Sequence, residues 1–235
     1  MKKLILISGK ARSGKNTFAD FLSNEFKKHN LTVEQDLYAN GVKNGSKEDF
    51  RPLSNFLNNY VERIKAQVGM LFSLDKITPQ APLGAIFGLL DQLKIEDHNW
   101  YEDKTPITRL ILQAYGTEIF RKRVDTDWWA KQLKERFLKS NSDIFLVTDV
   151  RFPNEIEVFN DAINYEVITI RVDRSVDIDP TVASHDSETA LDNWSEWTYL
   201  VDNNTTLESL KESVNVVLKD ILIPNDVSEK LFILA

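Results

Sequence analysis

The residues best placed to do chemistry lie near the start of the chain, in the stretch GKARSGKNT from Gly9 to Thr17, the phosphate loop. Its two glycines and Lys15 have the G-x-x-x-x-G-K spacing of a loop that wraps a phosphate group. Glycine lets the backbone N–H groups turn inward, and the lysine brings a positive charge to the β- and γ-phosphates. The stretch therefore predicts a site for a nucleoside triphosphate.

One position departs from the usual form of this loop, in which a serine or threonine directly follows the lysine. Asn16 stands there, and Thr17 comes one residue later. A chance glycine turn before a helix is the alternative interpretation. The complete spacing at the end of an apolar strand disfavours that alternative.

A second candidate is an acidic residue at the end of the apolar run Ile144 to Val147. In a P-loop sheet, a carboxylate at this end of a strand lies near the Mg²⁺ that accompanies the phosphates. Asp149 has this position, Arg151 follows it, and Glu155 lies four residues further on. The alternative is an aspartate that caps a helix at Pro153. Together with the phosphate loop, Asp149 predicts the second half of a metal and phosphate site.

A third candidate is the predicted helix TPITRLILQAYGTEIFRKR. Its apolar residues form one face, whereas Arg109, Gln113, Gly116 and Thr117 lie along another. A guanidinium, an amide and a hydroxyl in a row could hold a phosphate and read the edge of a base, and a solvated polar face is an equal alternative. The tryptophan pair that follows, which includes Trp129, is either core or a stacking surface for an aromatic ligand.

A fourth segment, SHDSET, contains His185, one of three histidines in the chain. No second histidine follows at metal-ligand spacing, so we reject a zinc site. No G-x-S-x-G turn occurs, which argues against a serine hydrolase. The simplest interpretation of this segment is the capped start of a helix.

The elements that must position these residues alternate along the chain. Apolar runs predict strands at 4–7, 32–38, 144–147, 167–172 and 199–202. Helical spacing predicts helices from about Lys15 and at 106–123, 126–139, 153–162 and 207–222. We therefore expect one α/β domain over 1–235, with a P-loop NTPase-type parallel β-sheet core flanked by helices. Residues 32–104 are expected to form a variable, mostly helical insertion or substrate-binding lobe.

Composition narrows the classes of partner. A net charge of −7 over 235 residues argues against general affinity for nucleic acid. No apolar run approaches the roughly 18 residues of a spanning helix, so we expect no membrane partner. The chain has no cysteine, which fits a reducing compartment, and we expect a cytoplasmic protein. The sequence leaves the oligomeric state open, a homodimer included.

Taken together, these segments resemble the deoxynucleoside monophosphate kinases of tailed bacteriophages, a branch of the P-loop kinases. The matching stretches are LISGKARSGKNTFADFL, RLILQAYGTEIFRKRVDTDWWAKQL, FLVTDVRFPNEIE and HDSETALD, in the family's order. In related nucleotide kinases a threonine often comes second after the loop lysine, so Asn16-Thr17 looks like a kinase variant. The resemblance implies an ATP-dependent enzyme with Mg²⁺, small-molecule substrates and, for a phage protein, a place in the host cytoplasm.

The resemblance also implies roles for individual residues. The ATP site would comprise Gly9, Arg12, Ser13, Gly14, Lys15, Asn16 and Thr17, with Thr17 and Asp149 as metal ligands. The monophosphate would be bound by Arg109, Gln113, Gly116 and Thr117, with Trp129 supporting the pocket. The catalytic set would be Lys15, Arg109, Asp149, Arg151 and Glu155, the last orienting Arg151 or the acceptor.

Two other functions remain open. Animal-type phosphomevalonate kinases are similar in the loop, in the strand that ends in D-x-R and in a late S-E-x-x-L-D segment, which Ser187 to Asp192 also matches. The run Gln113 to Thr117 and the tryptophan pair favour a nucleotide instead. A nucleotide-dependent switch or ATPase would have no use for the polar row that begins at Arg109.

Overall fold

The computed structural model describes residues 1–45, 112, 114–161, 163–175, 186–222 and 231–233. The chain forms two compact units, one of Met1–Gly41 with Asp127–Ala235 and the other of Val42–Thr126. Most of the second unit lies outside the described residues, and so does most of the lobe expected at 32–104. That lobe therefore stays a prediction.

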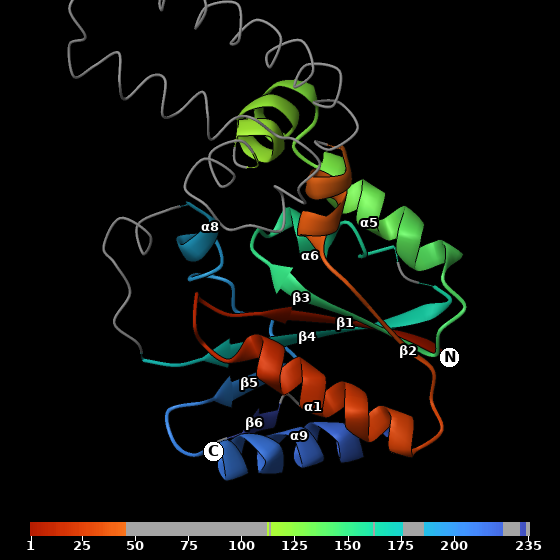
Figure 1. The fold of residues 1–235 in the computed structure, drawn as a ribbon, viewed down its shortest axis with the longest axis vertical. Coiled ribbons are helices and arrows are strands. Elements are labelled where there is room, and N and C mark those ends of the chain that lie inside the picture. Colours follow the sequence, from red (N-terminus) through yellow and green to blue (C-terminus); the bar gives the residue numbers. More distant parts are fainter. Residues whose placement is uncertain (46–111, 113, 162, 176–185, 223–230, 234–235) are drawn as a thin grey trace, which may run out of the picture. The chain divides into compact units, whose positions relative to one another are not determined.

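The described strands of the first unit form one parallel sheet in the order β2-β3-β1-β4-β5-β6 (Figure 1). The chain runs from β1 to β2 on one side and from β3 to β4 on the other, so the loops after β1 and β3 diverge. Ligands bind at such a switch point, at the carboxyl edge of a parallel sheet. The strands are β1 (Lys2–Ser8), β2 (Val33–Asp36), β3 (Ile144–Val150), β4 (Tyr165–Asp173), β5 (Tyr199–Asp202) and β6 (Leu231–Ile233).

Helices cover both faces of this sheet (Figure 1). One face carries α1 (Lys15–Lys28) and α9 (Leu207–Leu222), and the other carries α5 (Trp128–Lys139) and the short α6 (Asn154–Glu157). A further short helix, α8 (Asp186–Thr189), precedes β5. This architecture confirms the predicted fold class, a parallel α/β sheet of P-loop kinase type. No helix among the described residues has the length and apolar content needed to cross a membrane.

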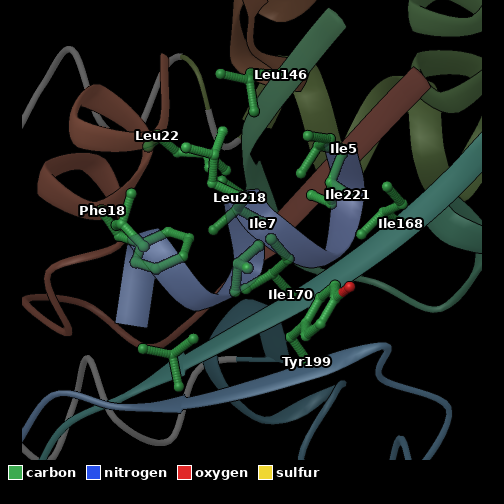
Figure 2. Packing of buried hydrophobic residues seen from close by; sticks show 14 of the residues in the cluster. Ile5, Ile7, Phe18, Leu22, Leu146, Ile168, Ile170, Tyr199, Leu218 and Ile221 are labelled. Carbon is green, nitrogen blue, oxygen red and sulfur yellow. The ribbon is translucent and has the colours of Figure 1, made fainter. Parts of the chain in front are cut away.

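The face under α1 and α9 is filled by aliphatic and aromatic side chains of alternate strand residues. Figure 2 shows Phe18 and Leu22 of α1 with Leu218 of α9 over Ile5 and Ile7 of β1. All five are buried, four of them completely. Burying such side chains stabilises the fold by roughly 1.5–3 kcal/mol each. This core fixes the start of α1, and with it the phosphate loop, against the end of β1.

The opposite face is held by a group of aromatic rings. Phe137 of α5 makes edge contacts with Phe145 of β3, with Phe159 after α6 and with Tyr165 of β4, at centroid distances of 5.4, 6.0 and 4.8 Å. Edge-to-face pairs of this kind add roughly 0.5–1.5 kcal/mol each beyond the area they bury. They fix α5 and the turn after β3 to the sheet.

Several elements differ from the sequence predictions. The helix expected at 153–162 ends at Glu157, because Phe159 and Asn160 turn back with bonds to the carbonyls of Ile156 and Glu157. The helix expected at 106–123 is described only in part, and the π-helix η1 (Ala114–Val124) replaces its second half. The bond from Asp125 N to Phe120 O, which spans five residues, extends the π-helical pattern by one residue. The strand β6 was not predicted. The predicted bounds of β5 and α9 agree with the structure.

Candidate active site

The phosphate loop joins β1 to α1 and needs its two glycines for close approach. Gly14 has φ of +90°, in the left-handed region that favours glycine, and a Cβ there would lie 2.2 Å from Asn203 Nδ2. A Cβ on Gly9 would lie 2.4 Å from both Ser13 Oγ and Val172 O. Any larger residue at either position would therefore displace the loop.

Bonds from distant segments hold this loop in shape. Asn203 Nδ2 donates to Ser13 O at 2.8 Å, and Ala11 N donates to Glu188 Oε2 at 2.7 Å. The hydroxyl of Ser13 is buried and has no hydrogen-bond partner among the described residues. Buried polar groups seldom lack a partner. The unpartnered hydroxyl and the glycine cradle fit a loop shaped around a polar ligand such as a phosphate.

The first turn of α1 continues the loop and offers backbone donors. The first helical bond of the turn is that from Phe18 N to Gly14 O, and no side chain caps the helix. The N–H groups before Phe18 therefore have no acceptor within the helix, and they carry the positive end of its dipole. Asn16 and Thr17 are exposed on this turn, and Arg12 is exposed just before it. The residue Thr17 is thus accessible from solvent.

Lys15 is the lysine of the G-x-x-x-x-G-K spacing and the first residue of α1. It is partly buried, and its ammonium donates to Lys10 O at 3.2 Å. Burial lowers the pKa of Lys15 to about 8, and repulsion by Arg151 and Arg171 acts in the same direction. The carboxylates of Glu188 and Asp149 act in the opposite direction. The charge of Lys15 therefore changes close to neutral pH.

This lowered pKa makes ATP binding dependent on pH. Bound triphosphate favours the charged ammonium and raises the pKa of Lys15, so binding above pH 8 requires uptake of a proton. We expect ATP affinity to fall as the pH rises through about 8, with up to one proton taken up per site. Calorimetry at pH 7 to 9, in buffers of different ionisation enthalpy, measures both. Lys15→Arg should abolish the dependence because arginine stays charged. An equal dependence in that variant would contradict this assignment.

Asp149 is the last residue but one of β3 and faces the start of the helix that begins at Tyr38. Its two carboxylate oxygens accept bonds from Tyr38 N and Ala39 N, at 2.8 and 2.9 Å. Burial raises the pKa of Asp149, while these two bonds and the charge of Arg151 oppose the rise. Asp149 thus caps a helix, although not the one at Pro153 that its sequence neighbours suggested. A carboxylate has about four lone-pair positions, so two stay open to a metal ion or its water.

Arg151 and Glu155 are joined through the backbone of the turn after β3. Glu155 is buried, and its Oε2 accepts bonds from Arg151 N at 2.7 Å and from Phe152 N at 3.1 Å. The guanidinium of Arg151 instead pairs with Glu188 at 2.8 Å and donates to Gly9 O at 3.3 Å. Glu155 therefore fixes the turn, while the phosphate loop and Glu188 fix the guanidinium.

The phosphate loop with Lys15, the arginine Arg151 and the aspartate Asp149 thus lie at the carboxyl edge of one parallel sheet. A family model described as deoxynucleotide monophosphate kinase matches residues 53–214, well over half of the chain. The chain belongs to this family. The match includes β3, the turn with Arg151 and α8, and it begins after the phosphate loop.

A curated relative agrees with the family. The chain is similar to the deoxynucleoside-5'-monophosphate kinase of Escherichia phage T5, at 34% identity over 64 residues. The similar segment covers 27% of this chain and 26% of the phage protein. The chain thus spans about a quarter of the length of the relative that it matches.

The contacts at the phosphate loop also include residues that motif reasoning did not assign. Glu188 is one of them, and Asp192 is another. Asp192 Oδ2 pairs with Lys10 at 2.9 Å, and Asp192 Oδ1 pairs with Arg171 at 3.4 Å. Both acids belong to the S-E-x-x-L-D segment, which was the available signal. Asn203, which holds the loop carbonyl of Ser13, follows β5 and carries no motif.

The residues expected to bind the monophosphate are described only in part. Gly116 and Thr117 lie in η1 of the second unit, while Arg109 and Gln113 lie outside the described residues. Trp129 is buried in α5 of the first unit, where a Cβ on Gly41 would lie 3.2 Å from its Cε3 atom. Among the described residues, no group of three or more His, Cys, Asp or Glu side chains could hold a metal ion. The role of these residues as an acceptor site stays a prediction.

Proposed function

We propose that this member of the deoxynucleotide monophosphate kinase family transfers the γ-phosphoryl group of ATP to a deoxynucleoside monophosphate, giving the diphosphate and ADP. One observation carries the proposal. The guanidinium of Arg151 lies against the phosphate loop, with its Nη1 at 3.3 Å from Gly9 O. A cation held there by the fold is suited to the charge that moves between two phosphates.

Positioning and electrostatics would supply the catalysis. Phosphoryl transfer needs two anions in line and positive groups that follow the charge, with little covalent chemistry by the protein. Lys15 and the free N–H groups of α1 would hold the ATP phosphates, and Arg151 would stabilise the group in transfer. Thr17 and Asp149 would hold Mg²⁺ with oxygen ligands, which this ion prefers. When bound, Mg²⁺ neutralises charge on the β- and γ-phosphates.

The proposed reaction is tested with a panel of acceptors. ADP release is measured with ATP, Mg²⁺ and each natural deoxynucleoside monophosphate, a few base-modified ones, the ribonucleotides and phosphomevalonate. We expect turnover with at least one deoxynucleotide and none with phosphomevalonate. Activity on phosphomevalonate alone, or on no nucleotide, would refute the proposal.

The acceptor site has its own test in Arg109. We expect Arg109→Ala to weaken use of the monophosphate, because a charge-assisted bond to its phosphate is lost. Basal ATP hydrolysis without acceptor should stay within about twofold, since the phosphate loop is untouched. Steady-state kinetics with and without acceptor measure both. Equal losses in the two reactions would favour a nucleotide-dependent ATPase without a second substrate.

A further inference from the structure

Glu188 occupies a place that the proposed reaction does not by itself explain. It lies on the short helix α8, its side chain is only 7% exposed, and both of its oxygens are engaged. Oε1 pairs with Arg151 Nη1 at 2.8 Å, and Oε2 accepts from Ala11 N at 2.7 Å. One buried carboxylate therefore links the phosphate loop to the turn after β3.

The bridge leaves the binding groups of the site free. Ala11 lies early in the loop, before the N–H groups of the first turn of α1, which have no acceptor within the helix. Arg151 has five N–H donors, and Nη1 serves both Glu188 and Gly9 O. The remaining donors of the guanidinium can still bind a phosphate oxygen. Glu188 thus restrains these groups without taking the place of a phosphate.

The rest of the segment around α8 is anchored as well. Leu191 is buried at 4% exposure, and Asp192 bonds to Lys10 at 2.9 Å. The buried leucine anchors the segment that carries Glu188, and the solvent-exposed Lys10–Asp192 pair adds only a weak second link to the phosphate loop. Such a rigid support keeps a functional side chain in one geometry.

We propose that Glu188 is a positioning residue that fixes the guanidinium of Arg151 against the phosphate loop before ATP binds. This inference rests on the proposed function, in which Arg151 stabilises the phosphoryl group during transfer. Partners that orient metal-binding side chains are worth roughly 10- to 100-fold in activity, and we expect an effect of the same order for the partner of Arg151.

The first test compares Glu188→Gln with Asp186→Asn, an exposed acid on the same short helix. We expect Glu188→Gln to lower kcat about 10- to 100-fold, with the KM for the monophosphate changed less than twofold. The amide still accepts from Ala11 N but presents its own N–H groups to Arg151. Asp186→Asn should match the wild type, and thermal unfolding of both variants checks the fold. Wild-type kcat in Glu188→Gln would overturn the proposal.

The second test asks whether Glu188 acts through Arg151. Glu188→Gln should cost less than about threefold in an Arg151→Ala background, because the group that it positions is gone. Glu188→Asp keeps the charge on a shorter side chain that cannot reach both Ala11 N and Arg151, so it should also lose turnover. If Glu188→Gln does not fold, Glu188→Asp takes its place in the kcat comparison and in the Arg151→Ala background. Equal losses with and without Arg151 would overturn the proposal.

Direct ATP binding separates this inference from the proposed function. Calorimetry with ATP needs no acceptor, and we expect the ATP affinity of Glu188→Gln to stay close to that of the wild type, because Lys15 and the N–H groups of α1 remain. A wild-type protein that binds ATP but phosphorylates no deoxynucleotide refutes the proposed function alone. With a deoxynucleotide that the wild type phosphorylates, a kcat of Glu188→Gln equal to that of Asp186→Asn overturns the role of Glu188.

Discussion

Arg151→Ala should lower the kcat of deoxynucleotide phosphorylation by on the order of 10³-fold, the effect of removing an arginine that stabilises a phosphoryl group in transfer. The guanidinium is held at the loop by Glu188 and by Gly9 O, at 2.8 and 3.3 Å. ATP binding should change much less, because Lys15 and the N–H groups of α1 remain. Single-turnover kinetics and calorimetry measure the two effects separately.

Two further variants sharpen this prediction. Arg151→Lys should recover only a small part of the rate, since an ammonium is a point charge and lacks the planar fork that bonds in two directions. Arg174→Ala removes an exposed arginine just beyond β4 and should stay within about twofold of the wild type. A kcat for Arg151→Ala within threefold of the wild type would show that this side chain does not touch the group in transfer.

The second large effect is expected for Asp149→Asn. The substitution keeps the size of the side chain but removes the charge that would hold Mg²⁺. Its amide also turns an N–H donor toward Tyr38 N or Ala39 N, both of which now donate to the carboxylate. We expect a loss in kcat of about 10²- to 10³-fold, the range for removal of one preorganised electrostatic contact. Thermal unfolding should show a cost of about 1–3 kcal/mol, because one buried donor is left unpaired.

A magnesium titration of activity distinguishes the loss of the metal-binding charge from the loss of the helix cap. Asp149→Asn should require more Mg²⁺ for half-maximal rate, whereas the capping defect alone would leave that requirement unchanged. Asp161→Asn is the matched control, because this acid is exposed and pairs with Lys134 on α5. It should leave both the rate and the Mg²⁺ requirement within about twofold. An unchanged Mg²⁺ requirement in Asp149→Asn would remove this residue from the metal site.

Local patterns predicted most of the sheet and the first half of the candidate site. The apolar run before Gly9 and the helical spacing after Lys15 placed the phosphate loop between β1 and α1. The same reasoning placed Asp149 at the end of β3. These predictions held because buried parallel strands are apolar throughout and the chemistry follows them directly in the chain. The length of α6 was overestimated, because the turn that follows it contains no proline or glycine that would predict the end of a helix.

The sequence by itself determined the fold class, the phosphate loop and the residues that end the strands, since each of these depends on neighbours a few positions away. Only the tertiary structure decided what those residues touch. Glu188 reaches Ala11 across 177 positions, Asn203 reaches Ser13 across 190, and Asp149 caps a helix 111 positions earlier. Such contacts follow from the order of strands in the sheet, β2-β3-β1-β4-β5-β6, which no local periodicity encodes.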